Sequence, residues 1–131
     1  MALRRPRVVI IDDDARVASI LVDFVLAMRT QCSVETASNG EAGLAAVRRE
    51  RPDLVLLDLR MPGIDGVEVV KRIRDIDAGI AVIVITGAGD LADARAALAS
   101  GAQACLHKPV DLEQFKYLVS DVLGESPSPE K

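Results

Sequence analysis

The chain has 131 residues, half of them apolar, and a formal net charge of −4. This length predicts one domain with a buried core, and the acidic balance argues against direct nucleic-acid binding. No apolar run reaches the roughly 18 residues of a membrane span, and two cysteines are too few for a disulfide framework, so we expect a reduced, cytoplasmic protein without membrane contact.

Five apolar segments alternate along the chain with five segments whose apolar residues have helical spacing. We expect strands at residues 8–11, 32–36, 54–57, 81–85 and 102–106. We expect helices at residues 15–28, 40–50, 66–75, 91–100 and 112–123, the last four with N-caps at Asn39, Asp65, Asp90 and Asp111. This alternation predicts an α/β fold, a doubly wound parallel sheet with helices on both faces and right-handed crossovers.

The two ends of the chain differ in composition from its middle. Residues 1–6 are basic and are predicted to be a solvated leader. Residues 7–123 form the predicted domain. Residues 124–131 contain the run Ser-Pro-Ser-Pro at 126–129, which predicts a C-terminal tail or the start of a linker to a further domain.

Polar side chains stand where the predicted strands stop. The first strand is followed by Asp12 and Asp13, the third by Asp58, the fourth by Thr86, and the fifth, one residue later, by Lys108. In a parallel sheet the carboxyl ends of all strands lie along one edge, and ligands of open α/β sheets bind there. We therefore expect these five side chains to converge.

Three carboxylates and one ammonium group at this edge call for a further cation or for raised carboxylate pKa values. Two like charges about 4 Å apart repel by roughly 4 kcal/mol near a protein surface, and oxygen ligands without His or Cys favour Mg²⁺. Mg²⁺ held by few carboxylates keeps positions for phosphate oxygens, which indicates phosphoryl transfer. Asp58 is then the candidate nucleophile that forms an aspartyl phosphate, Lys108 would neutralise the phosphoryl oxygens, and Thr86 would donate a hydrogen bond to them.

The same residues resemble the receiver domain of two-component response regulators. The resemblance covers residues 7–123 and rests on Asp12-Asp13, the run from Asp58 to Gly66, Thr86 and Lys108-Pro109. It implies a flavodoxin-like (βα)5 fold in three layers with strand order 2-1-3-4-5, and a cis Lys108–Pro109 bond. It also implies that Asp58 accepts a phosphoryl group from a sensor histidine kinase or a phosphotransfer protein.

The resemblance further implies the metal ligands and the output. Asp13, Asp58 and the backbone carbonyl of Arg60 would bind Mg²⁺ directly, and Asp12 would act partly through water. The chain would be a phosphorylation-dependent switch, whose own activities are limited to self-phosphorylation and autodephosphorylation. Its output would pass through the face made by the fourth helix, the fifth strand and the fifth helix. That face would contact an output domain, a partner protein or, after phosphorylation, a second copy of the chain.

One position departs from the family pattern. Receivers usually carry Tyr or Phe three residues before the lysine, and this chain has Cys105 there. The usual switch couples an inward shift of the threonine to rotation of that aromatic ring, and cysteine has no ring to rotate. We expect Cys105 to lie in the core and His107 to be exposed, with no partner that would make it a catalyst.

Two alternative functions remain open at this point. An aspartyl-nucleophile phosphohydrolase usually needs a second aspartate shortly after the nucleophile and a cap over its substrate. Here the second position after Asp58 is Arg60, and the chain has no insertion that would form a cap. A receiver-like docking module that is never phosphorylated is favoured only by Cys105.

Overall fold

The computed structural model describes residues 5–29, 31–87 and 89–123. Most of the predicted leader, all of the predicted tail at 124–131, and Ala88 lie outside these described residues. Within them strands and helices alternate: β1 (Arg7–Ile11), α1 (Ala15–Met28), β2 (Ser33–Ala37), α2 (Gly40–Arg49), β3 (Leu54–Asp58), α3 (Gly66–Ile76), β4 (Ala81–Thr86), α4 (Leu91–Ala99), β5 (Ala104–His107) and α5 (Leu112–Leu123).

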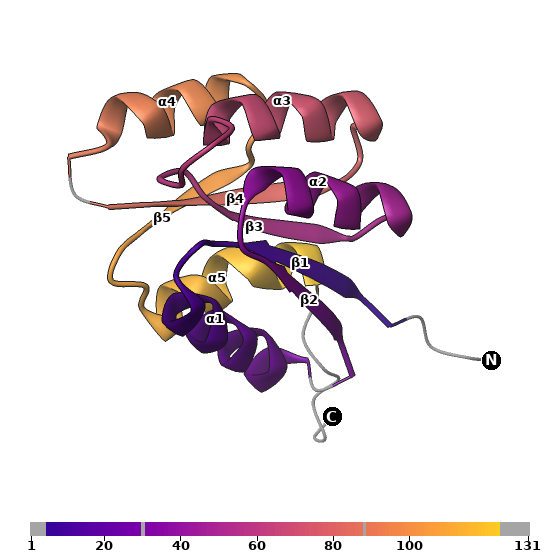
Figure 1. The fold of residues 1–131 in the computed structure, drawn as a ribbon. Coiled ribbons are helices and arrows are strands. Elements are labelled where there is room, and N and C mark those ends of the chain that lie inside the picture. The colour runs from indigo at the N-terminus through magenta and orange to yellow at the C-terminus, as the bar shows by residue number, and fades with distance from the viewer. Residues whose placement is uncertain (1–4, 30, 88, 124–131) are drawn as a thin grey trace.

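The five strands form one parallel sheet in the order β2-β1-β3-β4-β5, which confirms the predicted order. Helices α1 and α5 cover one face of the sheet, and α2, α3 and α4 cover the other (Figure 1). The carboxyl ends of the strands lie at the left of the view in Figure 1. The predicted three-layer architecture is therefore confirmed, and the loops that carry the predicted site residues share one edge.

The three central strands β1, β3 and β4 are buried along their whole length. Such unbroken apolar runs form strands when helices cover both faces of a parallel sheet. Alternate residues enter two separate clusters: Val9 and Ile11 pack towards α2, α3 and α4, whereas Val8 and Ile10 pack towards α1 and α5. Phe115 of α5 is the bulkiest fully buried side chain and belongs to the second cluster.

Four helices begin at an N-cap side chain. Oxygens of Asp14, Asn39, Asp65 and Asp111 accept hydrogen bonds from backbone N–H groups in the first turns of α1, α2, α3 and α5. These bonds satisfy donors that a helix leaves unpaired at its start. Helix α4 differs, because Asp90 precedes it without making a capping hydrogen bond. Asp90 therefore occupies the predicted N-cap position, but its side chain does not make the expected capping hydrogen bond.

The fifth strand begins two residues later than predicted. The reason is that the backbone N–H groups of Gly101 and Ala102 still donate hydrogen bonds to carbonyls of α4. Gly101 adopts a φ of 120°, and its N–H donates to the carbonyl of Leu98 at 3.2 Å. The N–H of Ala102 donates to the carbonyl of Ala97 at 3.0 Å. This pair of bonds closes the helix in a Schellman motif. The strand is consequently displaced along the chain, and His107, the only histidine of the sequence, becomes its last residue.

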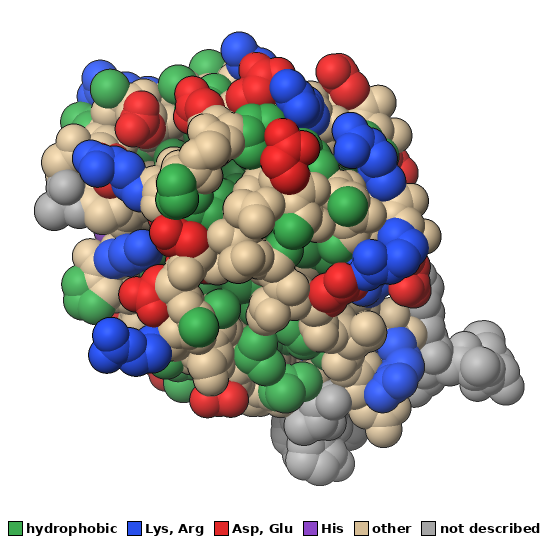
Figure 2. All heavy atoms as spheres, viewed as in Figure 1, with side chains coloured by type: hydrophobic (Ala, Val, Ile, Leu, Met, Phe, Trp, Pro, Cys, Tyr) green, Lys and Arg blue, Asp and Glu red, His purple; other side chains and the backbone are tan. Residues whose placement is uncertain are grey.

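Charged side chains of both signs are mixed over the surface. On the face shown in Figure 2, Lys and Arg lie close to Asp and Glu, and no broad basic area forms among the described residues of that face. This distribution offers no field that would attract nucleic acid to that face. In the part of the chain that the structure describes, no helix combines the length and the apolar character needed to cross a bilayer.

The first residue of α3 lies against the loop that follows β3. A Cβ atom on Gly66 would stand 2.8 Å from Cα of Leu59, a backbone atom that cannot move aside alone. We expect Gly66→Ala to lower the free energy of unfolding by about 2 kcal/mol, as overpacking does, measured by denaturant titration. Gly79→Ala is the matched control, since there the nearest atom is the tip of Arg51. Equal losses in the two variants would contradict this account.

Candidate functional site

Three carboxylates meet at the carboxyl ends of β1 and β3. These two strands are neighbours, with Ile11 paired to Leu57, so the residues that follow Ile11 lie beside Asp58. One carboxylate oxygen each from Asp12, Asp13 and Asp58 lies within 4.8 Å of the other two. Asp12 is 3% exposed and Asp58 is 2% exposed, whereas Asp13 faces solvent. The predicted convergence of the three side chains is confirmed.

Asp12 carries an unsatisfied oxygen. Its Oδ1 accepts a hydrogen bond from the backbone N–H of Asp14 at 2.8 Å, but its buried Oδ2 has no hydrogen-bond partner. Burial raises the pKa of Asp12 from 3.8 to about 6; the Asp14 N–H acts in the opposite direction, and the charge of Asp58 raises the pKa further. The adjacent Asp14 caps α1, so capping does not explain Asp12.

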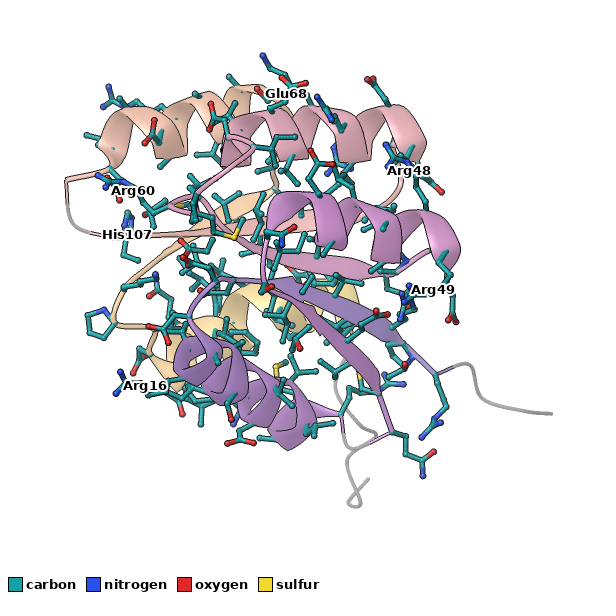
Figure 3. The ribbon with its side chains drawn as sticks, viewed as in Figure 1. Arg16, Arg48, Arg49, Arg60, Glu68 and His107 are labelled. Carbon is teal, nitrogen blue, oxygen red and sulfur yellow. The ribbon has the colours of Figure 1, made fainter. Side chains whose placement is uncertain are left out.

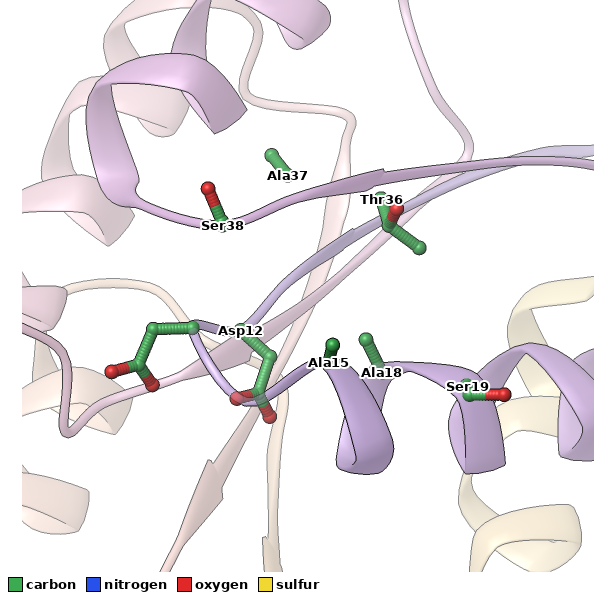
Figure 4. A pocket seen from close by; sticks show the side chains of 8 residues that line it. Asp12, Ala15, Ala18, Ser19, Thr36, Ala37 and Ser38 are labelled. Carbon is green, nitrogen blue, oxygen red and sulfur yellow. The ribbon is translucent and has the colours of Figure 1, made fainter.

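The cluster fits a hard divalent cation. A buried carboxylate oxygen without a donor is costly unless a cation or a proton neutralises it, and the available donors are oxygens alone. The site is open to one side: a hollow of about 230 Å³ next to Asp12 and Asp13 is bounded across from them by Ser38 (Figure 4). The residues present therefore fit Mg²⁺.

Asp58 is held from two directions. The Nζ atom of Lys108 lies 3.3 Å from its Oδ2, and the backbone N–H of Arg60 donates to its Oδ1 at 3.1 Å. Lys108 itself is anchored, because its backbone N–H donates to the carbonyl of Thr86 at 2.8 Å. The Lys108–Pro109 bond is cis, as the resemblance implied. The ammonium group of Lys108 thus contacts one of the three carboxylates, and its side chain is still one-third exposed.

Thr86 is the last residue of β4, and its side chain is fully buried. Its Oγ1 lies 3.5 Å from Sγ of Cys105 and 3.2 Å from Nδ1 of His107, both on β5. Cys105 is partly buried and packs against the cluster beneath α2, α3 and α4, so it lies at the border of the core rather than inside it. His107 is exposed as predicted, and its contact with the Thr86 hydroxyl was not anticipated from the sequence.

Arg60 joins two loops that the sequence left unconnected. Its guanidinium forms an ion pair with Oδ1 of Asp90, whose side chain is 4% exposed. The other oxygen of Asp90 accepts the backbone N–H of Gly87 at 3.2 Å. The carboxylate that was predicted to cap α4 therefore ties the loop after β3 to the loop after β4. In Figure 3 Arg60 and His107 both lie at the edge where the strands end.

A second hollow lies on the other side of Lys108. It has a volume of about 420 Å³ and is lined by apolar side chains of α1 and by the segment after β5: Val17, Ile20, Leu21, Lys108, Pro109 and Val110. Ile20 is 49% exposed, so this apolar surface reaches solvent. The hollow places an apolar contact area next to the ammonium group of Lys108.

The chain is similar to known proteins over most of its length. The family model described as "Response regulator receiver domain" matches residues 8–120. Sporulation initiation phosphotransferase F of Bacillus subtilis is 41% identical over 87 residues, which cover 66% of this chain and 70% of that protein. The probable C4-dicarboxylate response regulator DctR of the same organism is 34% identical over 116 residues, 88% of this chain, and the chain spans about half (51%) of its length.

Solved structures show the same architecture. A response regulator receiver domain protein (CheY-like) from Methanospirillum hungatei superposes with a TM-score of 0.84 at 26% identity, covering 92% of this chain and 94% of that one. A putative response regulator from Chloroflexus aurantiacus gives a TM-score of 0.83 at 28% identity, with 93% and 100% covered. The flavodoxin-like arrangement implied by the sequence is therefore confirmed.

Proposed function

The chain belongs to the response regulator receiver domain family, whose members are phosphorylation-dependent signalling switches, and from that premise we propose that Asp58 is its phosphoryl acceptor. The proposal rests on the local environment of the Asp58 carboxylate. Asp58 is 2% exposed, lies 3.3 Å from the ammonium group of Lys108, and shares a cation-sized space with Asp12 and Asp13.

The proposed reaction is an in-line phosphoryl transfer from a phosphohistidine of a partner protein. A carboxylate oxygen of Asp58 attacks phosphorus, a P–O bond forms, and the P–N bond to the imidazole breaks. The imidazole leaves with the electron pair of that bond and takes a proton from solvent. Lys108 is placed to neutralise charge on the transferred oxygens, and Thr86 to donate its hydroxyl proton to one of them. Hydrolysis of the aspartyl phosphate by water returns the switch to its resting state.

Asp13, Asp58 and the backbone carbonyl of Arg60 are the proposed direct ligands of Mg²⁺, with Asp12 acting partly through water. Bound Mg²⁺ supplies positive charge that screens the carboxylates from the incoming phosphoryl group. The unpartnered Oδ2 of Asp12 supports this assignment, because only a cation or a proton satisfies it. Self-phosphorylation from small phosphoryl donors is part of the same proposal.

The proposed phosphoryl donor is a sensor histidine kinase or a phosphotransfer protein. The apolar hollow between α1 and Pro109 supports this partner, since it lies beside Lys108 and suits an apolar helix face. The proposed output surface is the face of α4, β5 and α5, where Leu91, Leu98 and Tyr117 are exposed. An output domain, a partner protein or a second copy of the chain would bind there. The cytoplasmic location remains a prediction from the sequence.

The two alternative functions are not favoured. The family match speaks for a signalling switch and against a hydrolase of phosphate esters. Arg60 stands where such a hydrolase would need a general acid, and its guanidinium is paired with Asp90. The docking module rested on Cys105 alone, and the three carboxylates that a receiver needs are brought together in this chain.

Incubation with acetyl phosphate, followed by measurement of intact mass, tests the proposed function. We expect the mass of one phosphoryl group to be gained in the presence of Mg²⁺ and to be lost from the chain once the donor is removed. Excess chelator should prevent the gain. Continuous turnover of varied phosphate esters would support the hydrolase instead. A chain that gains no phosphoryl group from acetyl phosphate or from any histidine-phosphorylated partner would support the docking module.

A further inference from the structure

The hydroxyl group of Thr86 stands in a short chain of polar atoms that ends at the surface. Its oxygen lies between Sγ of Cys105 at 3.5 Å and Nδ1 of His107 at 3.2 Å. These contacts follow from the sheet register, which pairs Thr86 with His107 as the last residues of β4 and β5. Thr86 is fully buried, whereas the imidazole of His107 is exposed.

The direction of these hydrogen bonds can be assigned from the strength of the acceptors. A hydroxyl has one proton to donate. An unprotonated imidazole nitrogen is a good acceptor and a thiol sulfur is a weak one, so the Thr86 proton goes to Nδ1 of His107. The weakly acidic S–H of Cys105 can then donate to the hydroxyl oxygen or to the carbonyl of Leu106, 3.8 Å from Sγ. This arrangement satisfies the buried hydroxyl, and it requires the imidazole tautomer that carries its proton on Nε2.

If the proposed function is correct, a phosphoryl group on Asp58 is a second possible acceptor for the Thr86 proton. The present inference rests on that function. Asp58 on β3 is paired with Ile85 on β4, the residue just before Thr86. A phosphoryl group on Asp58 would therefore stand next to the Thr86 hydroxyl and present it with anionic oxygens, which are stronger acceptors than imidazole. Since one proton cannot serve both acceptors, phosphorylation must break the bond to His107.

We infer that His107 is a positioning residue that holds the Thr86 hydroxyl in the unphosphorylated state and releases it when Asp58 carries a phosphoryl group. The released Nδ1 becomes a free acceptor on an exposed ring at the end of β5, between the site and the proposed output face. Cys105 stands where receivers usually have an aromatic ring. In this chain the bond between Thr86 and His107 therefore provides the connection from Thr86 to the surface. The two states of His107 thus bias a pre-existing equilibrium, as a switch requires.

The single histidine makes the bond directly observable by nuclear magnetic resonance. At about pH 8, where imidazole rings are neutral, we expect one Nδ1 resonance in the wild-type chain, typical of a hydrogen-bonded acceptor. Beryllofluoride with Mg²⁺, a mimic of the phosphoryl group, should move this resonance to the value of a free acceptor. Thr86→Val, which keeps the shape and removes the hydroxyl, should give the free value without beryllofluoride and show no further change.

Two substitutions of His107 separate a positioning role from a merely structural one. His107→Asn keeps a polar group near the level of Nδ1, whereas His107→Gln places it near the level of Nε2. Loss of one net hydrogen bond from the resting state should make His107→Gln bind beryllofluoride about fivefold more tightly. His107→Asn should stay within about twofold of the wild-type affinity. His107 is exposed, so we expect both variants to fold.

The possible failures are distinguishable. A wild-type chain that does not bind beryllofluoride would overturn the proposed function, and the release step with it. An unchanged Nδ1 resonance in Thr86→Val would overturn the inference alone, because the bond would not exist in solution. The inference is also wrong if beryllofluoride binds and shifts amides near Asp58 but leaves Nδ1 unchanged, or if the Asn and Gln variants have equal affinities.

Discussion

Asp58→Asn is expected to abolish phosphoryl incorporation, with a fall of at least about a hundredfold in the rate, because a neutral amide is not a nucleophile towards phosphorus. The substitution changes one atom in a side chain that is 2% exposed, so packing is conserved. Its Oδ1 can still accept the Arg60 N–H, as Asp58 does at 3.1 Å. The measurement is intact mass after incubation with acetyl phosphate and Mg²⁺.

Asp65→Asn is the matched control for this experiment. Asp65 lies in the same loop region, caps α3 through a hydrogen bond to Val67, and is exposed. Asparagine caps helices as well as aspartate does, so this variant should be phosphorylated at the wild-type rate. Phosphorylation of the Asp58 variant at a comparable rate would mean that another residue is the acceptor, and the proposed site would have to be abandoned.

The second large effect is expected at Asp12, and it depends on pH. Because the folded-state pKa of about 6 lies above the ordinary value of 3.8, the folded metal-free chain holds the Asp12 proton more tightly than the unfolded chain does. The contribution of this group to stability is therefore complete below about pH 4 and is lost as pH rises through about 6. The loss amounts to at most about 3 kcal/mol.

Asp12→Asn should remove this pH dependence. The metal-free variant is expected to be more stable than wild type at about pH 7.5, because the buried charge is gone, and to gain nothing on acidification from this position. Its Mg²⁺ affinity should fall by about 10- to 100-fold, since an oxygen that supports the metal is lost. Chelator-treated protein is unfolded with denaturant at several pH values, and Mg²⁺ is titrated separately.

Asp23→Asn serves as the control in the same assays, because Asp23 is an exposed residue of α1 away from the cluster. It should leave both the pH profile and the Mg²⁺ affinity as they are in wild type. If Asp12→Asn lowers the stability of the metal-free chain at neutral pH, the repulsion ascribed to the buried carboxylate is not the dominant effect at this position.

The sequence predicts the acidic site well because two simple regularities act together. Apolar runs such as 54–57 identify central strands that are buried on both faces. The carboxyl ends of parallel strands then share one edge, which brings Asp12, Asp13 and Asp58 together without any knowledge of side-chain conformation. The Lys108 contact follows from the same rule, since β5 is delivered to that edge as well.

What the sequence does not predict depends on backbone hydrogen bonds between segments. The Schellman motif at Gly101 delays the start of β5 by two residues, and β5 then extends to His107, which pairs with Thr86. The signal that points to it is the presence of polar residues at the ends of two adjacent strands. Asp90 occupies a typical N-cap position, but the N–H of Gly87 and the guanidinium of Arg60 compete for its carboxylate. The preference of aspartate for N-cap positions does not indicate that the two groups compete for this carboxylate.

The burial of β1, β3 and β4 on both faces has a consequence for how the sheet finds its alignment. In a strand with one solvent-exposed face, a register shift of one residue raises the free energy because polar side chains would turn towards the core. These central strands lack that safeguard, since both of their faces are apolar. Sliding β1 or β3 past its neighbours would instead draw Asp12 or Asp58 into an apolar layer, at a cost of at least several kcal/mol. The carboxylates at the sheet edge thus disfavour shifts in strand register during folding. The residues proposed for signalling chemistry therefore also favour the correct alignment of the strands.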